Sequence, residues 1–164
     1  MSHIGPPRRL LLALCISLAA VGCQFPPKKL SEEQIAALRE IGFHRQGGNW
    51  GIDLDDGRIL FDNNETGLSA KNRATIASIV KTLKKVGISH IIVEGHTSNV
   101  GNENYNIYLS LRRARTVARE IARNGLPYRN IDIKGYGMTN PISDNATQEG
   151  RAQNRRVVLI VPME

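Results

Sequence analysis

The clearest candidate for ligand chemistry in this sequence is Arg113. The pattern of residues 104–124 predicts a helix whose buried side holds Leu109, Ala114, Val117, Ala118 and Ile121. The solvent-facing side carries a row of four arginines, Arg112, Arg115, Arg119 and Arg123. Arg113 is turned about 100° from Arg112 and therefore borders the buried side. A guanidinium can bind a carboxylate through two parallel hydrogen bonds, so we expect Arg113 to bind a ligand and the other four to be solvated.

Catalytic and metal chemistry have weaker support. Glu94 and His96 alternate along an expected strand and could form an acid–base or metal pair, but no third ligand has suitable spacing. Ser98 and Ser110 have no evident histidine–carboxylate pair to activate them. We therefore expect a binding module that is not an enzyme and holds neither a metal nor a cofactor, with His96 shaping its loop.

The composition narrows the choice of partner. Lysine and arginine number 22 against 15 acidic residues, and this balance would suit nucleic acid, an anionic membrane or an acidic polymer. Only 5% of residues are aromatic, and no basic run is interleaved with stacking rings. We therefore expect no nucleic-acid partner.

The amino terminus has the pattern of an export signal. Arg8 and Arg9 precede an apolar run at residues 10–21, which is too short to span a bilayer. The run ends in Ala20-Val21-Gly22-Cys23, which resembles the lipobox of bacterial lipoproteins. This resemblance implies lipidation of Cys23, and Gln24 in place of aspartate implies the outer membrane. The alternative is an ordinary signal peptide with an incidental cysteine.

Elements downstream of the signal follow from local patterns. Ser31 to Gln34 fits a capping box for a short helix that ends at Gly42, and Ser69 fits the cap of a second helix that ends at Gly87. Residues 50–54 and 58–61 predict a hairpin, and residues 88–94, 131–133 and 156–161 predict further strands. A polar loop joins the last two strands. A helix that crosses over between two strands implies parallel pairing, so we expect an α/β domain with two helices packed on a small mixed sheet.

The segment Glu94-Gly-His-Thr-Ser-Asn-Val-Gly101, followed by Tyr105-Asn106 and Leu109-Ser-Leu-Arg-Arg-Ala114, strongly resembles the signature of the OmpA-like domain. The run Gly150-Arg-Ala-Gln-Asn-Arg-Arg-Val157 resembles the closing motif of the same family. The resemblance covers roughly residues 59–161. We accordingly divide the chain into a signal peptide (1–22), a lipidated tether (23–30), a helix and hairpin segment (31–54) and an OmpA-like peptidoglycan-binding domain (55–164).

This resemblance implies noncovalent binding of the peptidoglycan stem peptide through its diaminopimelate, which carries an ammonium beside carboxylates. The residues at the family's binding positions are Asn64, Ser98, Gly101, Asn106, Arg113 and Arg155, with Arg156 as the alternative to Arg155. Ser98 is a departure, because the family has an aspartate there.

Within this family the chain resembles the YfiB type of lipoprotein, on residues such as Leu30-Ser-Glu-Glu-Gln34, Trp50 and Leu60-Phe61. That likeness implies a signalling role, in which a small periplasmic repressor is sequestered and an inner-membrane diguanylate cyclase is relieved. A structural tether between outer membrane and cell wall, like the peptidoglycan-associated lipoproteins, and a wall hydrolase are the alternatives.

The apolar residues ahead of the domain could serve such a partner. Leu38, Phe43 and Trp50 follow the tether closely, and we expect them to form part of a protein–protein surface. Ordinary packing of this segment on its own domain is the alternative.

Overall fold

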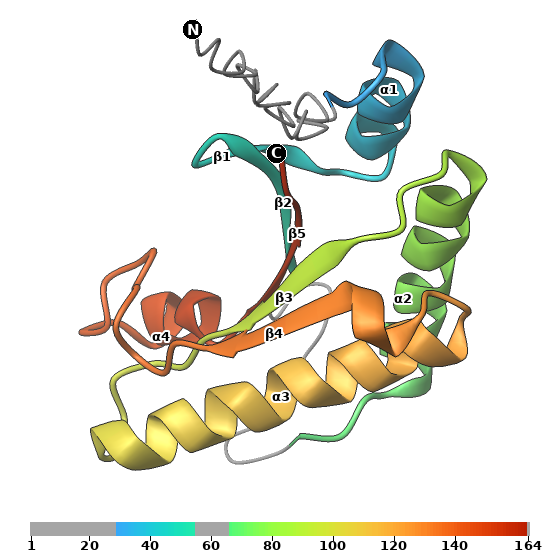
Figure 1. Ribbon diagram of the computed structural model, residues 1–164. Helices are drawn as coiled ribbons and strands as arrows, with labels where there is room; N and C mark the ends of the chain where they lie inside the picture. The colour runs from blue at the N-terminus through green and yellow to red at the C-terminus, as the bar shows by residue number, and fades with distance from the viewer. Residues whose placement is uncertain (1–28, 55–65, 164) are drawn as a thin grey trace, which may run out of the picture.

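The computed structural model describes residues 29–54 and 66–163 (Figure 1). Its three longer helices begin where side chains cap them. In α1 (Glu32–Glu40) the Ser31 hydroxyl accepts a hydrogen bond from the Gln34 amide at 3.2 Å, and the Gln34 side chain accepts one from the Ser31 amide at 3.0 Å. Ser69 caps α2 (Ala70–Lys85), and Asn102 caps α3 (Glu103–Arg123). The predicted caps of α1 and α2 are confirmed, whereas α3 begins slightly earlier than expected.

The sheet has five strands in the order β1-β2-β5-β3-β4. The strands are β1 (His44–Gln46), β2 (Asn49–Leu54), β3 (Ile91–Gly95), β4 (Ile131–Gly135) and β5 (Val157–Val161). β3 pairs in parallel with β4, and all other pairs are antiparallel. The predicted mixed sheet is confirmed, and its one parallel pair among the described strands joins the two strands that α3 connects.

Two predicted pairings need correction. β2 forms its hairpin with β1, through Gly47 and Gly48 at φ of 54° and 85°, a backbone region that suits glycine in tight hairpin turns. The expected partner at 58–61 lies outside the described residues. β2 and β3, which α2 connects, run in the same direction but are not neighbours, because β5 lies between them.

The stretch between β4 and β5 is more ordered than the long polar loop that the sequence predicted. It contains α4 (Gln148–Asn154), which is capped by Thr147: the Thr147 hydroxyl accepts a hydrogen bond from the Gly150 amide at 2.9 Å. A short 3₁₀ turn, η1 (Tyr128–Asn130), also precedes β4. The loop prediction was therefore wrong at residues 148–154.

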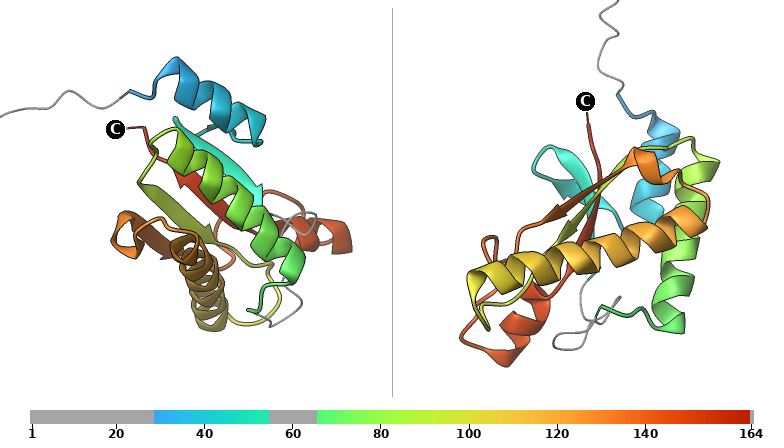
Figure 2. Two further views of the ribbon diagram at one scale, coloured as in Figure 1. Left: turned by 90° about the vertical axis from the view of Figure 1, so that its right-hand side faces the viewer. Right: turned by 60° about the horizontal axis from the view of Figure 1, so that its bottom comes forward.

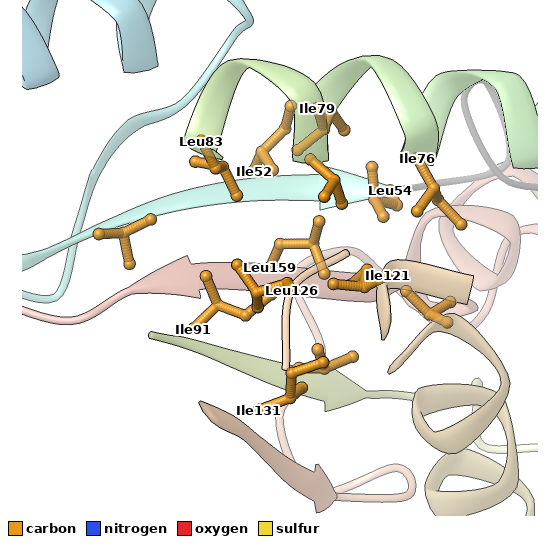
Figure 3. Packing of buried hydrophobic residues seen from close by; sticks show 14 of the residues in the cluster. Ile52, Leu54, Ile76, Ile79, Leu83, Ile91, Ile121, Leu126, Ile131 and Leu159 are labelled. Carbon is orange, nitrogen blue, oxygen red and sulfur yellow. The ribbon is translucent and has the colours of Figure 1, made fainter. Parts of the chain in front are cut away.

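A single hydrophobic core lies between one face of the sheet and the helices α2 and α3 (Figures 2 and 3). Alternate residues of β2, β3 and β5 point into it, and in-register pairs such as Ile52 with Leu159 stand side by side. On the helices, Ile76, Leu83 and Ile121 complete the packing (Figure 3). None of the helices in the described part of the chain is long and apolar enough to cross a membrane.

Leu38, Phe43 and Trp50 belong to this core. Their side chains are 0%, 2% and 3% exposed, so in this structure they are not available as the protein–protein surface that we expected. The physical reason is the amphipathic pattern itself, because α1 and β2 bury their apolar faces against their own domain. Residues 29–54 therefore share one core with the rest of the described chain.

Candidate functional site

Two glycines allow α3 to approach the sheet closely. Gly95 of β3 and Gly135 of β4 are directly paired, and a Cβ on Gly95 would overlap the carbonyl oxygen of Ser110 in α3. The Ser110 hydroxyl accepts a hydrogen bond from the Gly137 amide at 2.9 Å and donates one to the Ile107 carbonyl at 2.8 Å. The amino-terminal part of α3 is therefore held against the carboxyl ends of β3 and β4.

The loop between β3 and α3 is fixed at both ends. The Thr97 amide donates to the Gly137 carbonyl at 2.8 Å, and Asn106 Nδ2 donates to the Val100 carbonyl at 3.0 Å. Gly101 adopts a φ of 96°, so the chain turns here in a conformation that few other residues adopt. The Asn106 amide nitrogen therefore supports the loop, and its Oδ1 remains the acceptor of that side chain.

A cavity of about 220 Å³ lies between this loop, α3 and the end of α4. It is lined by Thr97, Ser98, Val100, Asn106, Leu109, Arg113 and Arg155. The structure thus brings together four of the site residues expected from the sequence, namely Ser98, Asn106, Arg113 and Arg155. Gly101 lies in the adjoining loop, and Asn64 lies outside the described residues.

Arg113 is the most deeply buried charged residue of α3. Its side chain is 1% exposed, whereas Arg112, Arg115, Arg119 and Arg123 are all exposed, as the helical spacing predicted. None of the described residues lining the cavity is acidic, and Arg113 and Arg155 contribute two guanidinium groups. Such a cavity favours a ligand with carboxylates, and Ser98 and Asn106 offer neutral acceptors beside them.

Arg155 and Arg156 were alternatives in the sequence, and the structure distinguishes them. Arg155 lines the cavity, while Arg156 lies on the other face of the sheet, is 3% exposed and donates from Nε to Asp53 Oδ1 at 3.2 Å. Burial lowers the pKa of Arg156, and the nearby Asp53 and Glu94 partly offset this effect. Arg156 therefore joins β5 to β2 and does not line the cavity.

The closing motif also supports the cavity in a way that sequence reasoning missed. Asn154 is fully buried; its Oδ1 accepts from the Ile142 amide at 2.8 Å, and its Nδ2 donates to Asn145 Oδ1 at 2.9 Å. Asn145 Oδ1 also accepts from the Asn99 amide at 3.3 Å. The threonine at 147, a good helix cap, was the signal for this arrangement. Thr97, Val100 and Leu109 also line the cavity and were not expected there. Leu109 was expected on the buried side of the helix instead.

Glu94 and His96 lie on the far face of the sheet. The His96 ring stacks on Tyr136 with centroids 5.5 Å apart, and its amide donates to the Arg156 carbonyl at 2.9 Å. Burial, and secondarily the charge of Arg156, lower the pKa of His96 to about 3. Glu94 Oε1 accepts from the Tyr136 hydroxyl at 3.4 Å. No cluster of potential metal ligands is found among residues 29–54 and 66–163.

Relatives of known sequence match the chain over different lengths. The outer-membrane lipoprotein YfiB of Pseudomonas aeruginosa is 43% identical over 99% of this chain and 98% of its own. The peptidoglycan-binding protein ArfA of Mycobacterium tuberculosis is 37% identical over 64% of this chain, which corresponds to 32% of ArfA. The first of these likenesses identifies the chain as an outer-membrane lipoprotein with a periplasmic domain.

Solved structures show the same arrangement of elements. The peptidoglycan-associated lipoprotein of Burkholderia pseudomallei superimposes with a TM-score of 0.58 at 25% identity, covering 62% of this chain and 86% of that one. The periplasmic domain of Helicobacter pylori MotB has a TM-score of 0.64 at 22% identity, covering 72% and 78% of the two chains, and shares the fold. The model of the OmpA family matches residues 60–155, and the chain belongs to the OmpA family.

Proposed function

We propose that the cavity binds the stem peptide of peptidoglycan, and in particular its diaminopimelate. The observation that carries this proposal is Arg113, a guanidinium held 1% exposed in the wall of a cavity that also contains Arg155. A buried arginine that lines a cavity is well placed to bind a carboxylate, because charge-assisted hydrogen bonds are stronger there than in water. The peptidoglycan-binding relative ArfA supports this ligand class.

The ligand ammonium requires acceptors close to the carboxylate site. Ser98 Oγ and Asn106 Oδ1 meet this requirement as neutral acceptors lining the cavity. Asn64 remains a further candidate support, and Gly101 shapes the turn between these two residues. The proposed recognition thus combines arginines for the carboxylates with neutral oxygens for the ammonium.

We infer binding without catalysis at this site. Thr97 and Ser98 line the cavity, but His96, which precedes them in the chain, stacks on Tyr136 on the opposite face of the sheet. A hydrolase would need a base in hydrogen-bond contact with its nucleophile or water. The described residues at the cavity therefore suit a binding role better than a catalytic one.

The test is a calorimetric titration of full-length protein in detergent with the tripeptide L-Ala–D-Glu–diaminopimelate. We expect Arg113→Ala to weaken binding by about thirtyfold or more, as loss of a buried charge partner does. Arg112→Ala is the matched control, because Arg112 is the exposed neighbour on the same helix. Circular dichroism checks that both variants fold.

A second ligand sharpens this test. The same tripeptide with lysine in place of diaminopimelate keeps the side-chain ammonium but lacks the carboxylate beside it, so wild-type protein should bind it much more weakly. Equal affinity for the two tripeptides, or unchanged binding by Arg113→Ala, would contradict the proposed site.

We propose further that Cys23 carries the lipid anchor. The apolar run at 10–21 and the small residues before Cys23 support this assignment, although both lie outside the described residues. Metabolic labelling with palmitate should disappear in Cys23→Ala and persist in Cys15→Ala. Label retained in Cys23→Ala would refute the assignment.

A second function, capture of a periplasmic repressor that frees an inner-membrane diguanylate cyclase, is favoured by the extent of one likeness. The 43% identity to YfiB covers 99% of the chain, well beyond the family match at residues 60–155. We propose that this capture adds signalling to wall binding. Overproduction of the protein should raise the cellular level of cyclic di-GMP. An unchanged level would contradict repressor capture and favour the alternative, a structural tether between outer membrane and cell wall.

A further inference from the structure

Exposed apolar and aromatic side chains gather at the cavity end of the domain. Six large hydrophobic residues of the described chain are exposed, and five of them lie here: Val100, Tyr105, Ile107, Tyr108 and Ile142. The sixth, Tyr128, lies in η1 beyond the other end of α3. Concentrated apolar exposure on a monomer often indicates a binding surface.

This surface is continuous with the cavity. Val100 lines the cavity and is also 66% exposed, so it forms part of the rim. Tyr105 lies one helical turn before Leu109, another lining residue, and a Cβ on Gly101 would stand 3.9 Å from the Tyr105 ring. Tyr108, 54% exposed, follows Tyr105 at the next adjacent position on the helix surface. We call Val100, Tyr105 and Tyr108 the rim surface.

The location of the rim surface within the domain restricts its partner. Leu30, ahead of α1, lines a pocket together with Val161 and Pro162 at the carboxyl end of β5, whereas α3 begins at the opposite end of the sheet (Figure 1). The cavity and its rim therefore lie far from the start of α1 and from the side on which an amino-terminal lipid anchor would hold the domain. This geometry favours a partner in the cell wall over the lipid surface.

We propose that the rim surface stacks against the glycan strand from which the bound stem peptide hangs; this inference rests on the proposed function of the cavity. A stem peptide is covalently attached to a sugar, so a peptide that enters the cavity places that sugar at the rim. One face of a pyranose ring presents C–H groups, and tyrosine offers it a rigid apolar ring together with a polar hydroxyl. The Arg112 guanidinium, 5.5 Å from the Tyr108 ring centroid, supports that ring from one side.

The test compares two ligands on full-length protein in detergent, the free tripeptide and the same tripeptide linked to its disaccharide. Wild-type protein should bind the disaccharide–peptide about threefold to tenfold more tightly than the free peptide. The double variant Tyr105→Ala/Tyr108→Ala should lose that difference and keep its affinity for the free peptide. Tyr108→Ala alone, at an exposed position, should lose part of the difference without risk to folding.

Two matched variants identify the interaction. Tyr105→Phe/Tyr108→Phe retains both rings and should preserve the preference for the disaccharide–peptide, while Tyr128→Ala, at the far end of α3, should change neither affinity. If the double alanine variant keeps the wild-type preference, the inference is overturned, the cavity proposal stands, and the surface is left for a lipid or protein partner. If wild-type protein binds neither ligand, the proposed function fails and the inference with it.

Discussion

Arg155 and Arg156 are consecutive residues whose side chains serve opposite faces of the sheet. Arg155 contributes to the cavity that contains Arg113, whereas Arg156 is buried beside Asp53 of β2, with Nε and Oδ1 3.2 Å apart. Arg155 caps the end of α4 and Arg156 leads into β5, so the division falls where the chain changes from helix to strand. A cavity-lining charge and a structural charge are thus separated by one peptide bond.

The ion pair between Asp53 and Arg156 should stabilise the fold. Asp53→Asn removes the charge partner of a guanidinium that is 3% exposed, and we expect it to lower the free energy of unfolding by about 3 kcal/mol. Urea denaturation measures this difference. Asp132→Asn is the control, because the pair of Asp132 with His90 is well exposed and should contribute less than about 0.5 kcal/mol. Equal losses in the two variants would show that the buried pair of Asp53 with Arg156 stabilises the fold no more than the exposed pair of Asp132 with His90.

The neutral side chain of Ser98 should limit ligand affinity. Replacing it by aspartate places a carboxylate near the proposed ammonium site, and we expect Ser98→Asp to tighten stem-peptide binding by about threefold to thirtyfold. Calorimetry with the diaminopimelate tripeptide measures the change. Asn99→Asp adds the same charge at the exposed neighbouring position and should have little effect. Weaker or unaltered binding by Ser98→Asp would place the ammonium elsewhere.

Gly95 should tolerate no side chain. Its Cβ would overlap the backbone of Ser110, so Gly95→Ala must displace α3 or the sheet, and we expect a loss of about 3 kcal/mol in unfolding free energy. Because α3 carries Asn106 and Arg113, stem-peptide affinity should fall as well. Gly67→Ala is the matched control, since a Cβ there would meet nothing within 4 Å. A Gly95→Ala protein as stable as the control would contradict this close packing.

His96 should make stability depend on pH. The folded state holds the pKa of His96 at about 3, below the ordinary value of 6.5, so between these values the unfolded state binds one more proton. Stability contributed by the neutral ring is therefore complete above pH 6.5 and declines as the pH falls, by about 1.4 kcal/mol per unit at most. His96→Phe, which retains an aromatic ring beside Tyr136, should flatten this dependence in urea denaturation between pH 6.5 and 5. Identical slopes for both proteins would show that His96 does not titrate this way.

Local signals made much of this fold predictable from the sequence. Ser31 and Ser69 mark helix starts because their hydroxyl groups satisfy free backbone amides, and Gly42 and Gly87 adopt positive φ just beyond the helix ends. The burial of Arg113 followed from its angle on the helix. These features depend on neighbours within a few residues.

Features that depend on distant contacts were missed. No local pattern indicates that β5 lies between β2 and β3. The hairpin of β1 with β2 did have a local signal, the pair Gly47-Gly48, which sequence reasoning overlooked. The apolar character of Phe43 and Trp50 is compatible with either an interface or a core, and only the packing of α1 and β2 on the domain decides for the core. The faces of Arg155 and Arg156 depend likewise on the register of β5.

The central position of β5 has a consequence for how the protein matures after export. β2 contacts β5 on one side and β3 contacts it on the other, so β5 alone joins the two parts of the sheet. In a chain that enters the periplasm amino end first, the edges of β2 and β3 that pair with β5 stay unpaired until residues 157–161 arrive. Such edges readily pair with other chains, which makes this interval the one in which a periplasmic chaperone would protect the polypeptide most.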